Sequence, residues 1–288
     1  MSRRLGFRKP RLETKTDAEL RLMRKAGLVV AGTLQMLAEA TREAVTPLEL
    51  DALAEQHIRR AGARPSFLEV PRYRHCLCVS VNDEVVHGIP GDRPLRQGDL
   101  VSIDCGAVLD GWHGDAAISL LVGEADQARP EDRALVEVTE EALWAGICAF
   151  TVGGHIGDIG AAVEDAVTAA QRRLPSPGDA FGIVTEYEGH GIGRHMHMSP
   201  GVANHRSAER GPRIRSGATV AIEPMVTLGS AQTAVLEDGW TVITTTGGRA
   251  AHWEHTVATT DAGLCVLTAA DGGAARLTAL GVPFTALD

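Results

Sequence analysis

The sequence predicts an α+β fold built from two related halves. Two helical segments followed by strands occupy the chain up to residue 121, and the same order of elements returns from residue 131 onward. With 288 residues, of which 44% are hydrophobic, the chain is long enough to bury a full core. We therefore expect two halves that close on one central site.

Capping patterns mark where the first helices begin. Thr16 is followed three residues later by Glu19, and Thr46 stands directly before Pro47. The first pair is a capping box, and proline is favoured at the first position of a helix. Four long helices are expected, at about residues 16–44, 46–61, 131–150 and 155–173.

Apolar alternation and turn residues predict the strands. Val101 and Ile103 alternate with polar residues, and Asp110-Gly111 is typical of a hairpin turn, so we expect two antiparallel strands on either side of it. Pro224 is expected to end a later strand. The predicted strand regions are residues 75–82, 100–121, 181 onward, 219–227 and 240–246.

Four acids and one histidine occur in short segments with distinctive chemistry: Asp104, Asp115, His190, Glu223 and Glu254. Any one of them alone is more simply explained as a turn or surface residue. Asp104, however, lies within an apolar strand, where we expect it to face Asp115 across the hairpin, and an unpaired buried charge is costly. This oxygen-rich set is too poor in sulfur for structural zinc. It predicts two divalent cations and hydrolysis of an amide.

Five motifs in order resemble those of the type I methionine aminopeptidases. They are residues 82–90 (NDEVVHGIP), the paired-aspartate hairpin, residues 189–194 (GHGIGR), residues 222–225 (IEPM) and residues 253–256 (WEHT). The resemblance covers about residues 16–268, and the short interval between His197 and Glu223 leaves no space for the helical insertion of type II enzymes. It implies the pita-bread fold, with two pseudo-symmetric halves and a central curved antiparallel sheet covered by helices. The implied organisation is a basic disordered tail, residues 1–14, followed by one catalytic domain, residues 15–288.

The resemblance also implies a role for each metal ligand. Asp104 chelates one metal ion and His190 the other, while Asp115 and Glu254 bridge both ions. Glu223 binds the ion on the His190 side and serves as the general base, or lies next to it.

Two further histidines match the family's substrate contacts. His87 hydrogen-bonds the scissile peptide nitrogen and His197 the carbonyl oxygen, and the substrate's amino terminus lies on the Asp104 side. The pocket for the methionine side chain is formed by Tyr73, Cys78, Met196 and Trp240. For the remaining histidines, among them His252, we expect structural roles.

The chain departs from the family pattern at several positions. Val70, Pro71 and Arg72 stand where the family usually has tyrosine, histidine and glycine, and Met196 replaces a phenylalanine. Ala116 and Ala117 follow Asp115 where a hydroxyl residue is usual, which removes a hydrogen bond next to the metal site.

The implied enzyme is a methionyl aminopeptidase, a metal-dependent hydrolase. It removes the initiator methionine from nascent proteins when the second residue is small, by attack of a water activated by two metal ions. An aminopeptidase or prolidase of the same fold with another side-chain preference is the alternative that the segment 70–72 leaves open. A non-catalytic peptide-binding module is a weaker alternative, because all five ligands and both histidines are present.

The composition limits the cellular compartments and the partners that fit the protein. No apolar run is long enough to span a membrane, and five cysteines without zinc-type spacing fit reduced thiols. We expect a cytoplasmic monomer that binds N-terminal peptides of nascent proteins and neither membrane nor DNA, with weak contact between the basic tail and the ribosome as a less favoured interpretation. The two ions can be Co, Mn, Fe(II), Zn or Ni, since the ligand set accepts all of them.

Overall fold

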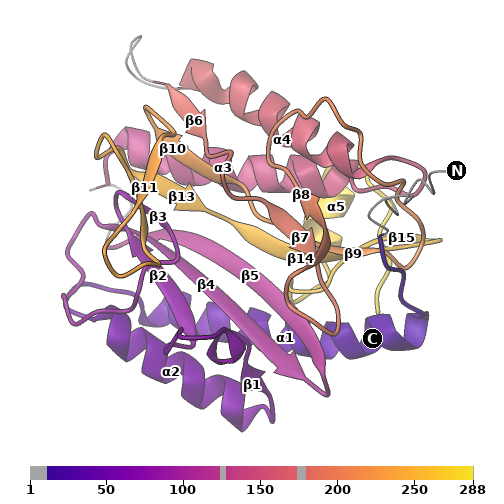
Figure 1. The fold of residues 1–288 in the computed structure, drawn as a ribbon, viewed down its shortest axis with the longest axis horizontal. Coiled ribbons are helices and arrows are strands. Elements are labelled where there is room, and N and C mark those ends of the chain that lie inside the picture. Colours follow the sequence, from indigo (N-terminus) through magenta and orange to yellow (C-terminus); the bar gives the residue numbers. More distant parts are fainter. Residues whose placement is uncertain (1–11, 124–127, 174–179, 288) are drawn as a thin grey trace, which may run out of the picture.

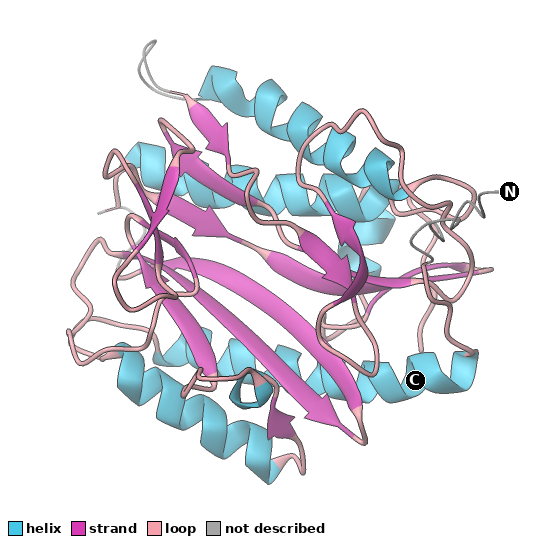
Figure 2. Cartoon of the chain, viewed as in Figure 1, coloured by secondary structure: helices cyan, strands magenta, loops and turns pink. Residues whose placement is uncertain are grey.

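Helices cover both sides of a set of twisted strands (Figures 1 and 2). The computed structural model describes residues 12–123, 128–173 and 180–287. Within these ranges the helices are α1 (Asp17–Ala40), α2 (Pro47–Arg60), α3 (Pro130–Ala149), α4 (Ile156–Ala170) and the short α5 (Ala274–Ala279). In Figure 1, α1 and α2 lie below the strands and α3 and α4 above them, so each predicted half supplies one helical pair.

The described strands form one large antiparallel sheet and two small ones. The large sheet has the order β1 (Arg64–Pro65), β4 (Leu100–Leu109), β5 (Trp112–Leu121), β14 (Glu254–Thr260), β9 (Thr219–Ile222), β7 (Gly189–Gly191) and β8 (Met198–Val202), with β2 (Leu77–Val81) pairing with β4 and β15 (Gly263–Val266) with β14. One small sheet consists of β13 (Ala250–His252), β10 (Met225–Leu228) and β6 (Phe181–Ile183), and the other of β11 (Thr233–Val235), β12 (Val242–Thr244) and β3 (Glu84–Val86). The architecture is the predicted α+β arrangement.

The predicted helix starts and the hairpin turn are found in the structure. Thr16 and Glu19 form a reciprocal capping box, and so do Thr46 and Glu49. Asp110 and its neighbour Gly111 both have positive φ, 52° and 77°, as a tight turn between β4 and β5 requires. The first helix ends at Ala40, four residues earlier than predicted.

The predicted strand at residues 219–227 is broken in the middle. β9 ends at Ile222 within the large sheet, and β10 begins at Met225 within a small sheet. A second crossing of the same kind occurs at Trp253, which separates β13 from β14 and whose N–H donates to Pro224 O at 3.4 Å. The chain therefore passes from the large sheet to a small sheet after β9, and from that small sheet back to the large sheet before β14. Glu223 and Glu254 both lie where the chain crosses between the two sheets.

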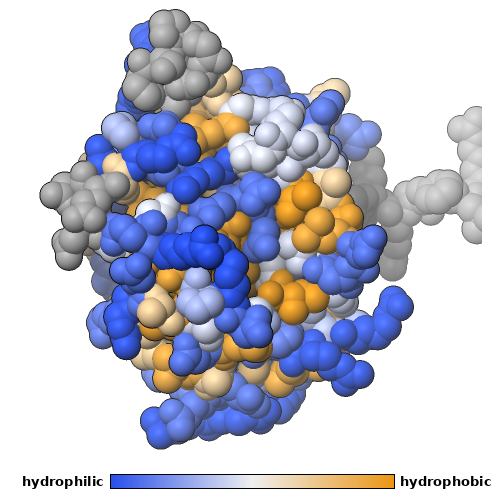
Figure 3. Space-filling model, turned by 90° about the vertical axis from the view of Figure 1, so that its left-hand side faces the viewer, coloured by the Kyte–Doolittle hydropathy of each residue, from blue (hydrophilic) through white to orange (hydrophobic). Residues whose placement is uncertain are grey.

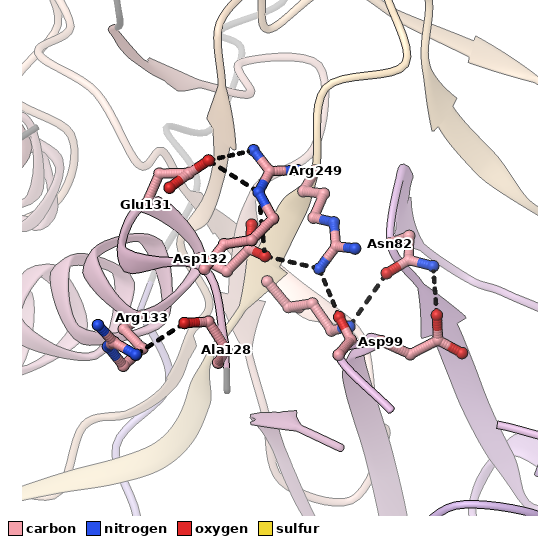
Figure 4. A network of polar contacts seen from close by, with 10 residues as sticks. Asn82, Asp99, Ala128, Glu131, Asp132, Arg133 and Arg249 are labelled. Atoms are coloured by element: carbon pink, nitrogen blue, oxygen red, sulfur yellow. Dashed lines mark hydrogen bonds and ion pairs between the residues drawn. The ribbon is translucent and has the colours of Figure 1, made fainter. Parts of the chain in front are cut away.

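A buried polar network connects the two halves (Figure 4). Arg249 Nη1 donates at 2.7 Å both to Asp132 Oδ2 at the start of α3 and to Gly98 O before β4. Asn82 Nδ2 in turn donates to Asp99 Oδ1 at 2.8 Å. Because Asp132 is 1% exposed, its ion pair with Arg249 is shielded from solvent, and the bond from Arg249 to Gly98 O connects this pair to the first half.

Most of the predicted tail lies outside the described residues. Of its last three residues, Thr14 forms an isolated bridge with Ala218, and Leu12 packs against the hydrophobic core below α3 and α4. None of the helices in the described ranges is both long enough and apolar enough to cross a membrane. The face drawn in Figure 3 carries mainly hydrophilic side chains, with hydrophobic ones in scattered patches.

Candidate metal centre and active site

The five predicted ligands come from five neighbouring strands of the large sheet. In the order of the sheet, Asp104 lies on β4, Asp115 on β5, Glu254 at the start of β14, Glu223 directly after β9 and His190 on β7. Residues that are far apart in the sequence are thus brought into one row by strand pairing alone. His190 lies in the short strand β7.

The register of β4, β5 and β14 puts three carboxylates on one face. Asp104 pairs with Ala117, and Ala117 pairs on its other side with Glu254. Asp115 faces Gly106, so the two aspartates are diagonal neighbours, which corrects the expectation that they face each other directly. They still share a face, because Asp115 is two residues from Ala117 on the same strand.

Gly106 and Ala117 are small enough to leave room for the side chains of these carboxylates. A Cβ at Gly106 would come within 2.9 Å of Ser66 Cβ and 3.2 Å of Asp115 Oδ1, so a larger residue would displace the carboxylate. Ala117 is buried between Asp104 and Glu254, with no hydroxyl to hydrogen-bond to either. The predicted loss of a supporting hydrogen bond at this position follows directly from its place in the sheet.

The carboxylates are buried close together without partners. Asp104 Oδ1, Asp115 Oδ1 and Glu254 Oε1 are buried and have no hydrogen-bond partner among the described residues. Burial raises the pKa of Asp104 to about 7. Burial, and then the neighbouring carboxylates, raise the pKa of Asp115, Glu223 and Glu254 well above the usual range. A group of neighbouring carboxylate oxygens that are buried without hydrogen-bond partners is suited to binding cations.

His190 is held in the tautomer that a metal ligand needs. Its Nδ1 lies 3.0 Å from the carbonyl oxygen of Gly191, which can only accept a hydrogen bond, so Nδ1 carries the hydrogen. Nε2 then presents its lone pair to the site, 3.5 Å from Glu223 Oε1. Ligand atoms of His190, Asp115 and Glu254 lie within 4.8 Å of one another, which is close enough to share an ion.

Thr256 fixes the backbone of Asp115 at the end of the β5–β14 ladder. The Thr256 hydroxyl accepts the N–H of Asp115 at 3.0 Å and donates to the Asp115 carbonyl at 2.8 Å. Thr268 Oγ1 accepts the N–H of Thr256 at 3.1 Å and so holds that residue in turn. All three side chains are buried, so no solvent can replace these bonds.

Replacing Thr256 with valine should destabilise the protein measurably. The change keeps the shape but leaves the buried N–H and carbonyl of Asp115 without their shared partner, and we expect the free energy of unfolding to fall by roughly 1–3 kcal/mol. Urea denaturation of metal-free protein measures this. Thr256→Ser, which retains the hydroxyl, is the matched control, and equal losses in both variants would contradict the role of the hydrogen bonds.

The two predicted substrate histidines flank the carboxylates. His87 follows β3 with a φ of 60°, in the left-handed region, and its ring lies edge-on to Tyr187 at 5.6 Å. The ring of His197 lies 4.5 Å from that of His190. Burial lowers the pKa of His87 to about 4 and also lowers that of His197, so both rings are neutral near pH 7.

An apolar cavity of about 190 Å³ opens beside the carboxylates. The four predicted pocket residues, Tyr73, Cys78, Met196 and Trp240, all line it, together with Val70, both histidines and the five ligands. Two further residues, Phe67 and Val86, line the cavity without having been predicted to do so. Phe67 belongs to a short 3-10 segment with no strand or helix periodicity, so only its aromatic character gave a signal.

The unusual segment 70–72 affects the cavity through only one of its residues. Val70 lines the cavity, whereas Pro71 and Arg72 are exposed and are not among the lining residues. Arg72 has a φ of 72°, a left-handed conformation that suits glycine, the residue that the resemblance implies at this position. The substitution at Arg72 thus keeps the backbone turn that positions Tyr73.

Comparisons with known proteins agree with this geometry. The model of metallopeptidase family M24 matches residues 21–261, which is most of the chain and contains all five ligands. The chain belongs to metallopeptidase family M24. The M24 peptidase is therefore a hydrolase that binds divalent metal, and the orphaned carboxylate oxygens fit such ions.

Methionine aminopeptidases are among its similar relatives. The M24 peptidase is 51% identical over 255 residues to methionine aminopeptidase 1 of Mycobacterium tuberculosis (strain CDC 1551 / Oshkosh), covering 88% of this chain and 94% of that protein. It is 42% identical to methionine aminopeptidase 1 of Bacillus subtilis (strain 168), over 88% and 98% of the two chains. The resemblance predicted from the motifs is confirmed.

Solved structures confirm the pita-bread fold. Methionine aminopeptidase from Thermotoga maritima superposes with a TM-score of 0.83 and 35% identity, covering 90% of this M24 peptidase and 100% of that chain. Prolidase from Pyrococcus furiosus superposes with a TM-score of 0.69 at 20% identity, over 88% and 65% of the chains. The second likeness concerns the fold alone.

Proposed function

We propose that the protein is a methionyl aminopeptidase that removes the initiator methionine from proteins whose second residue is small. The observation that carries this proposal is the position of an apolar cavity directly beside three buried carboxylates, the half-buried carboxylate of Glu223 and three imidazoles. The relatives named methionine aminopeptidase support the same reaction. The prolidase alternative has only fold similarity in its favour.

The donor set supports two divalent ions, held as the resemblance implies. Asp104 would bind one ion and His190 with Glu223 the other, with Asp115 and Glu254 shared between them. When bound, the ions lower the pKa of a water molecule and polarise the scissile carbonyl. Co, Mn, Fe(II), Zn and Ni all suit these ligands, so the supply in the cell selects the ion.

The protein side chains then orient the peptide and move the proton. Glu223, whose pKa is raised by burial and by Asp104 and Glu188, is suited to accept a proton from the attacking water. His197, on the His190 side, would hydrogen-bond the carbonyl oxygen as negative charge develops, and His87 would hydrogen-bond the peptide nitrogen.

The cavity is suited to a thioether side chain because its polar atoms are already engaged or uncharged. The Tyr73 hydroxyl donates to Leu77 O at 2.7 Å, and burial raises its pKa above the usual range. Burial also raises the pKa of the Cys78 thiol well above its usual range, so no charge faces the cavity from either residue. Met196 and Trp240 add flexible and aromatic apolar surface, which favours an unbranched sulfur-containing side chain.

A peptide panel tests this specificity. We expect metal-stripped protein resupplied with Co²⁺, Mn²⁺, Fe²⁺ or Zn²⁺ to release methionine from Met-Ala-Ser at least about tenfold faster than leucine from Leu-Ala-Ser, because a branched side chain fits the pocket less well. Ala-Pro-Ser is the prolidase-type substrate of the panel. Preferred cleavage of Ala-Pro-Ser or Leu-Ala-Ser would refute the methionine assignment and favour the alternative.

The domain organisation, compartment and partners of the enzyme are part of the same proposal. Residues 15–288 are proposed to act as one catalytic domain, since the polar network around Arg249 connects its halves. A cytoplasmic monomer whose partners are the N-terminal peptides of nascent chains stays a prediction from the sequence. Five free cysteines support a reducing compartment, and weak ribosome contact through the basic tail stays a prediction.

A further inference from the structure

A buried histidine, His252, lies behind the carboxylate of Glu223 and belongs to neither the ligand set nor the cavity lining. It is the last residue of β13 and is 1% exposed. Its Nε2 has no hydrogen-bond partner among the described residues and lies 4.0 Å from Glu223 Oε2. A buried polar atom without a hydrogen-bond partner lowers the stability of the fold. An unpaired nitrogen beside a functional carboxylate therefore needs an explanation.

The backbone of His252 is anchored to the β4–β5 hairpin by two buried serines. Ser119 Oγ accepts the N–H of His252 at 2.9 Å and donates to its carbonyl oxygen at 2.8 Å. Ser102 Oγ lies 2.8 Å from Ser119 Oγ and also accepts the N–H of His252, at 3.3 Å. The imidazole therefore projects from a backbone that is fixed in place.

Glu223 lies between two imidazoles, one facing each oxygen of its carboxylate. Its Oε1 faces His190 Nε2 at 3.5 Å, and its Oε2 faces His252 Nε2. Because His190 carries its hydrogen on Nδ1, its Nε2 cannot donate to the carboxylate. Asn204 donates to the backbone carbonyl of Glu223 at 3.0 Å, which fixes the main chain but not the carboxylate.

We propose that His252 is a positioning residue for Glu223, donating from Nε2 to Oε2 and holding the carboxylate so that Oε1 faces His190 and the substrate. The separation of 4.0 Å is about 1 Å longer than a hydrogen bond, and a small rotation of the Glu223 side chain closes it. Such contacts tighten in the working complex. The inference rests on the proposed function of the site, and it adds a residue for which the sequence predicted a structural role only.

The first measurement uses metal binding, which does not depend on activity. Metal-stripped full-length protein is titrated with Co²⁺, and binding is followed by calorimetry and by the visible absorption of the bound ion. We expect His252→Leu to weaken binding by about 10–100-fold, as loss of a group that orients a ligand typically does. His252→Gln, whose amide can donate to Oε2, should stay within about threefold of the wild type.

A matched control and a double variant isolate the route through Glu223. His57→Gln changes a histidine that contacts Thr33 far from the site, and it should leave Co²⁺ binding unchanged. In a Glu223→Ala background, His252→Leu should add no further loss, because the carboxylate that it orients is gone. With Met-Ala-Ser as substrate, the single leucine variant should lower kcat while KM changes by less than about threefold.

Three outcomes would overturn the inference. These are wild-type Co²⁺ binding and kcat in His252→Leu, losses that add fully in the Glu223→Ala background, or no rescue by His252→Gln. If the leucine variant does not fold, His252→Asn takes its place, since the shorter amide cannot reach Oε2. A peptide panel without methionine release would refute the proposed function, whereas the Co²⁺ measurements would still decide the role of His252.

Discussion

Methionine release is expected to fall by about 10³-fold or more when Glu223 is replaced with glutamine, because the amide cannot accept the proton of the attacking water. The change preserves size at the corner between β9 and β10, so the fold should survive. Initial rates on Met-Ala-Ser with Co²⁺-loaded protein give the loss, and circular dichroism checks the fold.

Two further measurements make this result interpretable. Glu137→Gln alters an exposed glutamate on α3 and should keep wild-type rates. Co²⁺ content separates the two roles proposed for Glu223: a variant that retains both ions without activity has lost the base, and a variant that also loses one ion has lost a ligand. Activity within tenfold of the wild type would refute both roles.

Metal-free protein should become more stable when Asp104 is replaced with asparagine, and the gain should depend on pH. The folded-state pKa of Asp104 is raised to about 7 by burial, whereas an aspartate in the unfolded chain has a pKa of about 3.9. Between these values the folded protein binds the proton more tightly than the unfolded chain does. Ionisation of Asp104 therefore removes stability progressively as pH rises from about 4 to about 7.

The asparagine variant escapes this loss. At pH 8 we expect its free energy of unfolding without metal to exceed that of the wild type by roughly 2–4 kcal/mol, since one pKa unit corresponds to about 1.4 kcal/mol. The gap should close near pH 4 and should reverse when Co²⁺ is added, because the wild type gains a charged ligand. Asp110→Asn in the exposed hairpin turn is the control. A gap that does not change with pH would contradict the electrostatic explanation.

Much of the fold could be predicted because its signals are local. Thr16 with Glu19 marks a helix start, and Asp110-Gly111 marks a hairpin, through hydrogen bonds and backbone angles that involve only near neighbours. The break between Ile222 and Met225 was predicted only in part, because Pro224 was expected to end a strand while residues 219–227 were still taken as one strand region. Which sheet each part joins depends on the distant strands β14 and β13.

The site shows the same division between local and distant information. The identity of each ligand was legible from its motif, but the diagonal offset of Asp104 and Asp115 depends on the register of β4 and β5. His252 was taken as structural because a lone histidine usually is, and its neighbours Glu223, Ser102 and Ser119 are 29 or more residues away in the sequence. No single-sequence pattern reports such a contact.

The proposed ligands of the metal centre come from both halves of the chain, Asp104 and Asp115 from the first and His190, Glu223 and Glu254 from the second. An unfolded or half-folded chain cannot gather them, so metal ions bind only the native state and shift the folding equilibrium by mass action. At a free ion concentration a hundred times the dissociation constant, the shift is about 2.7 kcal/mol per site. Metal supply in the cell should therefore set the lifetime of this protein against proteolysis as well as its rate of catalysis.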